Sequence, residues 1–123
     1  MDYPGSDIYL LGTSFGGNYL IRYLLNEKRP SIKGLVALAP PLNVKKVVDD
    51  MPVIYQKFFV KMYIDWNVTK HPEMEYWERI GLVDLNAVKK AANLREFHDE
   101  LTIKILGFKD TDELFSHYHI SEE

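Results

Sequence analysis

Short apolar runs and glycine-rich turns alternate along the first forty residues. Residues 8–11 (IYLL) and 34–39 (GLVALA) are continuous apolar runs of the length expected for strands buried in a parallel sheet. A helix is expected between the two runs, and Pro30 and Ser31 end it. The apolar residues of that helix recur at helical spacing: Leu20, Ile21, Leu24 and Leu25. Two buried strands joined by a helix predict a βαβ unit, and hence an α/β fold.

From residue 42 onward the chain is more polar, and its apolar residues follow a helical period. Helices are expected over four stretches: residues 44–50, 53–64, 73–80 and 85–97. Asp84 is a candidate N-cap for the last of them. Residues 101–106 (LTIKIL) alternate enough to predict a short strand, which Gly107 ends.

The predicted strands are too few for a complete sheet. A pair of strands leaves two open edges and buries little core, so the βαβ unit needs further strands beside it. The sequence does not supply them. We therefore expect a piece of an α/β enzyme, with a partial core over residues 1–41 and a helical region of the same domain over residues 42–123.

Composition narrows the classes of function. The 123 residues are 46% hydrophobic and 27% charged, with a formal net charge of −3, which is ordinary for a globular domain. The basic residues form no stripe, so nucleic acid is not an expected partner. Without cysteine there is no disulfide framework and no thiolate chemistry. No apolar run approaches the roughly 18 residues that span a bilayer, so membrane association is expected only through segments outside these residues.

The run GTSFGG, between the first strand and the helix, is the strongest chemical signal. A serine hydroxyl becomes a nucleophile only when a base takes its proton and the backbone exposes its oxygen. The G-x-S-x-G pattern around Ser14 meets the second condition through a sharp, strained strand-to-helix turn. Gly12 and Gly16 are expected to avoid collisions with neighbouring elements, and Gly17 to allow close packing. The N–H of Phe15, at the positive end of the helix, is the expected oxyanion-hole donor.

Other interpretations of these residues are less favoured. A phosphate-binding loop would need the lysine of a Walker sequence or the G-x-G-x-x-G spacing, and the run has neither. A structural Gly-Ser turn is the second alternative, but a preceding apolar strand and a following amphipathic helix favour the nucleophile. No metal or organic cofactor is expected, since His117-x-His119 offers two ligands with no third at a fixed spacing.

A self-contained catalytic triad is a further alternative. Hydrolases of this type carry Ser, Asp and His in that order along the chain. The candidates that follow Ser14 are Asp110 or Asp112, and His117 or His119. This alternative requires residues 103–106 to form a true strand of the sheet. His98 beside Asp99 is expected to be an exposed or helix-packing pair instead.

Two blocks of the chain resemble the AB hydrolase 4 family, which includes bacterial YheT-like hydrolases, plant embryogenesis-associated hydrolases and animal lipid esterases. The first block is GTSFGGN, leading through Tyr23-Leu24 to ALAP at residues 37–40. The second is LREF at residues 94–97, followed by Leu101-Thr102, Gly107-Phe108 and the acidic run to Phe115. The blocks span most of this chain but only a middle portion of a family member.

The resemblance implies an α/β-hydrolase fragment in which residues from about 42 to 121 form a helical cap inserted into the sheet. Such caps line an acyl-binding cleft. It also implies that the catalytic Asp and His lie beyond Glu123, and that the second oxyanion donor lies before Met1. The chain departs from the family pattern at His98, where an acidic residue is usual, and at Leu114-Phe115, where tyrosines are usual.

The sequence therefore predicts a serine hydrolase that acts on carboxylic esters, lipid or other medium-to-long acyl esters, through an acyl-enzyme on Ser14. One alternative is a non-catalytic fragment or pseudoenzyme that binds lipid or a partner protein through its cap. Another is an acyltransferase that uses Ser14 in the same way. If the flanking DNA encoded an Asp at a strand end and a later His, the enzyme would be favoured over the non-catalytic fragment or pseudoenzyme.

Overall fold

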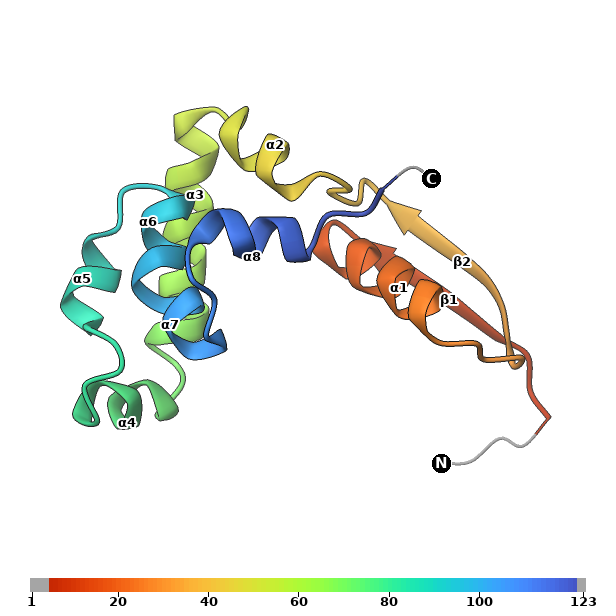
Figure 1. Cartoon of the computed structure of the whole chain (residues 1–123), viewed down its shortest axis with the longest axis horizontal. Helices are drawn as coiled ribbons and strands as arrows, with labels where there is room; N and C mark the ends of the chain where they lie inside the picture. The colour runs from red at the N-terminus through yellow and green to blue at the C-terminus, as the bar shows by residue number, and fades with distance from the viewer. Residues whose placement is uncertain (1–4, 122–123) are drawn as a thin grey trace. The chain divides into compact units, whose positions relative to one another are not determined.

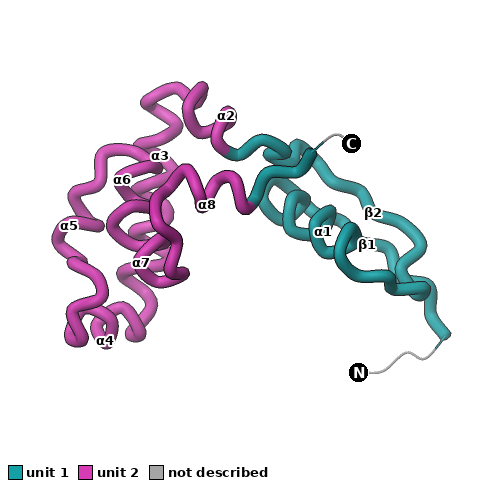
Figure 2. Tube along the Cα trace, in the orientation of Figure 1, with its two compact units in different colours: residues 1–44, 118–123 teal, residues 45–117 magenta. Residues whose placement is uncertain are grey.

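The computed structural model describes residues 5–121. The chain forms two compact units (Figure 2): a sheet unit, residues 1–44 with 118–123, and a helical unit, residues 45–117. Two strands and a helix come first along the chain, and a series of short helices follows (Figure 1). Within the described residues, no helix has the length and apolar character needed to cross a membrane.

The sheet unit contains the predicted βαβ arrangement. Strand β1 (Ile8–Thr13) leads into helix α1 (Phe15–Asn26), and strand β2 (Ile32–Leu38) follows. The two strands pair in parallel along their length. Helix α1 contacts both strands and lies alongside them (Figure 1). The predicted α/β class and the predicted order of the three elements are therefore confirmed.

The strands are more exposed than the sequence predicted. Tyr9 and Leu11 on β1 are 73% and 67% exposed, and Val36 and Leu38 on β2 are more than half exposed. Because α1 is one helix against a two-stranded sheet, it cannot cover both faces. The expectation of buried strands is wrong for the described chain, and the sheet unit buries little apolar surface of its own.

A series of short helices follows β2. They are α2 (Val44–Asp49), α3 (Val53–Tyr63), the π-helix η1 (Ile64–Val68), α4 (Glu73–Arg79), α5 (Leu85–Lys90), α6 (Leu94–Phe97), the π-helix η2 (His98–Thr102), α7 (Ile103–Leu106) and α8 (Thr111–His117). The first three α-helices of this series confirm the predictions over 44–50, 53–64 and 73–80. Buried side chains from several helices form the core of the helical unit: Val60, Val88, Leu94, Phe97, Leu101, Leu114 and Phe115.

The helix predicted over residues 85–97 is two helices. Asp84 caps the first as expected, since its carboxylate accepts hydrogen bonds from the N–H groups of Asn86 and Ala87. The chain leaves helical geometry after Lys90, and Asn93 is the N-cap of α6. The Asn93 side chain accepts from the Glu96 N–H at 2.9 Å, and the Glu96 carboxylate accepts from the Ala92 N–H at 2.8 Å. This reciprocal cap starts a new helix where the hydrophobic period alone continues the old one.

The strand predicted over residues 101–106 is wrong. These residues belong to η2 and α7, and Gly107 ends α7 with a left-handed backbone at φ 75°. The buried positions Leu94, Phe97 and Leu101 follow one another at steps of three and four, which is a helical stripe that runs into this segment. Packing of that stripe in the core outweighs the strand preference of the β-branched residues in the segment.

Candidate active site

Ser14 occupies the turn between β1 and α1 and has an unusual backbone. Its φ is 50° and its ψ is −129°, which is a conformation that residues with a Cβ rarely adopt. The Ser14 N–H donates to the Leu38 carbonyl at 2.9 Å, so the end of β2 fixes the turn. The side chain of Ser14 is exposed and makes no hydrogen bond that caps α1. The serine is therefore exposed at the end of the strand, and its role as a nucleophile stays a prediction.

The glycines around Ser14 have different roles. A Cβ at Gly12 would lie 2.8 Å from the backbone carbonyl group of Gly16 and 2.8 Å from the Cα of Gly17, so the turn excludes any side chain there. A Cβ at Gly17 would lie 3.1 Å from the Cβ of Pro40 and 3.2 Å from that of Ala37. A Cβ at Gly16 would meet no described atom within 4 Å. The predicted collision at Gly16 is therefore wrong for residues 5–121, since that position faces open space.

The amino end of α1 offers backbone N–H groups beside Ser14. The Ser14 carbonyl accepts from the N–H groups of Gly17, at 3.0 Å, and Asn18, at 3.3 Å. The N–H of Phe15 belongs to the first turn, where no intrahelical acceptor exists, and it follows the serine directly. The positive end of the helix dipole lies at the same place. The assignment of Phe15 as an oxyanion donor remains a prediction that this geometry permits.

Asn18 is a residue that sequence reasoning did not assign a role. Its side chain is completely buried one turn after Ser14. The Asn18 amide donates to the carbonyls of Pro41 and Tyr118, which are distant in sequence. The only local signal for Asn18 is its position directly after the glycine pair in the first block of the resemblance.

The self-contained triad loses its structural basis. It required a strand at residues 103–106, and that segment is helix α7. One of its acids, Asp112, is held in the helical unit by Arg95 at 2.9 Å and Lys45 at 3.1 Å. The hydrogen bond from Arg95 lowers the pKa of Asp112, with a further contribution from Lys45. Such a carboxylate serves an ion-pair network, not a catalytic histidine.

His98 is packed inside the helical unit. Its ring makes edge-on contacts with Phe97 and Phe115, and its Nδ1 lies 2.9 Å from the hydroxyl of Thr102. Burial lowers the pKa of His98 from 6.5 to about 4, although the neighbouring Asp99 acts in the opposite direction. A histidine with this pKa is neutral at pH 7 and stays so well into the acid range. Of the two expected surroundings, the structure shows the helix-packing one.

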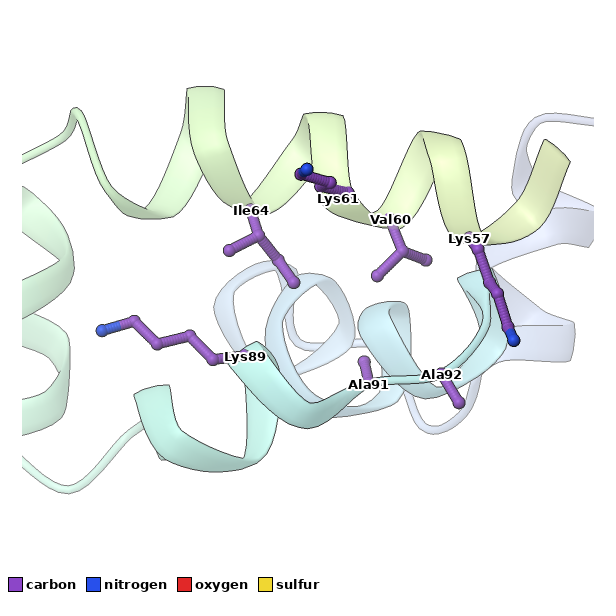
Figure 3. Close-up of a pocket in the computed structure, with 7 residues that line it drawn as sticks. All are labelled: Lys57, Val60, Lys61, Ile64, Lys89, Ala91 and Ala92. Carbon is purple, nitrogen blue, oxygen red and sulfur yellow. The ribbon is translucent and has the colours of Figure 1, made fainter. Parts of the chain in front are cut away.

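A groove of about 380 Å³ lies within the helical unit, between α3 with η1 and the segment that joins α5 to α6 (Figure 3). The side chains of Val60 and Ile64 point into it, and lysines surround it (Figure 3). Its lining consists of Lys57, Val60, Lys61, Ile64, Lys89, Ala91 and Ala92. None of these residues carries a hydroxyl, carboxylate or imidazole group, so the groove contains no member of a Ser-His-Asp triad. Among the described residues, no cluster of three or more His, Asp or Glu side chains could hold a metal ion.

An apolar strand leads through a strained serine into a helix, and a second parallel strand follows. This strand–turn–helix arrangement is the one in which α/β-hydrolases carry their nucleophile. The family model that matches the chain, Hydrolase_4, is described as serine aminopeptidase, S33, and it covers residues 1–106. The chain therefore belongs to this family of α/β-hydrolases. No curated protein and no solved structure matches the chain. The resemblance to α/β-hydrolases is confirmed.

Proposed function

We propose that Ser14 is the nucleophile of a serine hydrolase that cleaves carboxylic esters of medium or long acyl chains. One observation carries the proposal: an exposed serine holds a positive φ of 50° at the turn from β1 to α1. Backbone strain of this kind costs about 1–3 kcal/mol and persists at functional sites, where the surroundings fix it. A structural turn would have no need of a serine here, because glycine adopts the same backbone without strain.

The proposed chemistry is acyl transfer through Ser14. The Ser14 Oγ attacks the carbonyl carbon of the ester while a histidine takes its proton. The Phe15 N–H stabilises the negative charge on the carbonyl oxygen. Collapse of the tetrahedral intermediate expels the alcohol, which receives the proton from the histidine, and leaves the acyl group on Ser14. Water then attacks the acyl-enzyme in the same way and releases the carboxylic acid. The histidine and its acidic partner lie outside these residues in this proposal, as the resemblance implies.

A fluorophosphonate probe tests the nucleophile. The protein is expressed with the flanking sequence that its gene encodes, treated with the probe and digested, and the labelled peptide is identified by mass spectrometry. We expect label on Ser14 and none in Ser14→Ala. Ser31→Ala is the matched control, because Ser31 is exposed in the turn before β2, and it should label normally. Label that persists in Ser14→Ala would refute the proposal.

A peptidase is the second candidate, and the description of the matching family as a serine aminopeptidase favours it. The two reactions share the nucleophile and differ in the leaving group. Turnover of p-nitrophenyl esters of increasing acyl length is compared with turnover of amino-acid p-nitroanilides that have a free amino group. The ester proposal expects hydrolysis of the esters, with a preference for acyl chains longer than acetate. Faster turnover of the anilides would assign the site to peptides.

A further inference from the structure

Asn18 joins two segments that are far apart in the sequence. Its side chain is 0% exposed, and it lies in α1 four residues after Ser14. The Asn18 Nδ2 donates to the Pro41 carbonyl at 2.8 Å and to the Tyr118 carbonyl at 2.9 Å. Pro41 lies where the chain leaves β2, and Tyr118 lies where it re-enters the sheet unit. Residues 39–42 and 118–120, which we call the two stems, are therefore held by one amide group.

Further contacts connect the stems to each other and to α1. The Ile120 N–H donates to the Leu42 carbonyl at 2.9 Å, which pairs the stems directly. The Tyr118 ring makes edge-on contacts with Phe15 and Tyr19, with ring centroids 6.2 and 5.5 Å apart. These contacts place the returning stem on the first turns of α1, beside the residue that follows Ser14.

The outgoing stem is pressed against the same turn of α1. Pro40 lies so close to Gly17 that a Cβ on the glycine would come within 3.1 Å of the proline Cβ. Ala39 has a positive φ of 47°, so the backbone bends sharply as it leaves β2. The Asn18 amide donates a hydrogen bond to the carbonyl of Pro41, the residue after Pro40. Each of the two stems thus contacts residues in the first turns of α1, which follow Ser14.

The oxygen and the nitrogen of the Asn18 side-chain amide differ in their hydrogen bonding. Its Oδ1 is buried and accepts no hydrogen bond from the described residues. A buried acceptor without a partner costs stability, and a leucine of similar size would remove that cost. The asparagine is therefore explained by its two N–H donors, since its oxygen contributes nothing that the described chain uses.

We infer that Asn18 is a positioning residue that holds the two stems, at either end of the helical unit, to the turn bearing Ser14. In this role it holds the two stems against the first turn of α1, next to the proposed nucleophile, without touching the substrate. The catalytic consequence rests on the proposed function, whereas the tie itself does not. The Asn18 amide is the group that contacts both stems by hydrogen bonds, so a change in their spacing alters its bonds directly.

Amide exchange tests the tie in the unmodified chain. Nuclear magnetic resonance should show the two Nδ2 protons of Asn18 exchanging with solvent at least about tenfold more slowly than those of Asn26, because a fully buried side chain holds both of them in hydrogen bonds. Asn26 is a matched reference on the same helix, since its amide is exposed and donates to the Arg22 carbonyl. Equal exchange of the two asparagine side chains would overturn the inference.

Substitution separates a positioning role from a general structural one. In Asn18→Leu, exchange of the Ile120 N–H is expected to rise at least about tenfold, while the Ser14 N–H bonded to β2 keeps its protection. Asn26→Leu is the control and should change neither. A uniform rise across β1, α1 and β2 would show that Asn18 only supports the fold, and an unchanged Ile120 would show that the tie does not exist.

The link to Ser14 is measured in the protein expressed with its flanking sequence. Fluorophosphonate labelling of Ser14 should slow at least about tenfold in Asn18→Leu and stay unchanged in Asn26→Leu. Labelling at the normal rate, with faster exchange at Ile120, would leave the tie intact and refute its effect on the nucleophile. No labelling in the unsubstituted protein would refute the proposed function instead, while the exchange results would still decide the tie.

Discussion

The helical unit and the sheet unit differ in how far they bury their apolar residues. Leu114 and Phe115 are each 2% exposed in the core of the helical unit, whereas Leu11 on β1 is 67% exposed. Short helices that pack on several sides can bury one another, but a two-stranded sheet with one helix has a face that nothing in the described chain covers. The comparison shows that a hydrophobic core organises the helical unit. Local constraints position the turn at Ser14 instead: excluded side chains, a bond to β2 and one buried amide.

A matched pair of leucines gives the largest expected difference between the units. Leu114→Ala should lower the free energy of unfolding by about 4 kcal/mol, because it leaves a cavity in a packed core. Leu11→Ala should change it by less than about 0.5 kcal/mol, because the side chain is already exposed. Urea unfolding followed by circular dichroism measures both. Similar losses at the two positions would mean that the face of β1 is covered in solution.

Acidification should weaken the helical unit through His98. Its folded-state pKa of about 4 lies below the unfolded value of 6.5, so the unfolded chain binds the proton first as the pH falls. The contribution of the neutral ring is fully present above pH 6.5 and is lost as the pH falls toward 4, by up to about 3 kcal/mol.

The His98→Phe substitution provides the comparison for this pH effect. Stability of the variant should lack the change that His98 produces between pH 6.5 and 4. Urea midpoints measured at half-unit pH intervals give the two profiles. Identical profiles would show that the His98 ring is hydrated and not packed as the structure describes.

Two glycines of the turn test whether local constraints position Ser14 in the sheet unit. Gly12→Ala should cost about 2–3 kcal/mol, because the new methyl group meets backbone atoms that cannot move aside easily. Gly16→Ala should be nearly neutral, because its Cβ meets no described atom within 4 Å. Hydrogen exchange of β1 and β2 amides reports the local cost. A severe effect at Gly16 would indicate that another segment of the protein packs there.

The smallest effect is expected from the strained residue itself. Ser14→Gly should stabilise the sheet unit by about 1 kcal/mol, since glycine adopts a φ of 50° without strain. Ser14→Ala keeps the Cβ and should give no such gain. Both variants should abolish probe labelling. A loss of stability in Ser14→Gly, measured by exchange of the β2 amides, would argue that the turn is not strained in solution.

Sequence reasoning succeeded where the determining interactions are local. The strands, α1 and the serine turn were predictable because apolar runs and glycines mark them directly. The break before α6 has a local signal in the sequence, the Asn93 and Glu96 pair of a reciprocal cap. The hydrophobic period continues across it, however, and led to the prediction of one helix. Six residues at 101–106 fit both a strand and a helix, and only the stripe that begins at Leu94 decides between them.

The role of Asn18 lay beyond such reasoning for a physical reason. Its partners are the backbone carbonyls of Pro41 and Tyr118, and a carbonyl is the same in every residue type. A contact between a side chain and distant backbone therefore leaves no mark at the partner positions. The exposed face of the sheet was equally hidden, because an apolar run indicates a strand but does not say what covers it.

The hydrogen bond between the Ile120 N–H and the Leu42 carbonyl brings the two ends of the intervening residues next to each other. Two points of a chain that already lie next to each other can be bridged by a few residues or by many, since the entropy of closing a loop grows only slowly with its length. A short glycine-rich bridge, or a foreign helical segment, could be spliced between these points without lengthening the span to be closed. The segment between the two points can then be replaced while the βαβ scaffold stays the same.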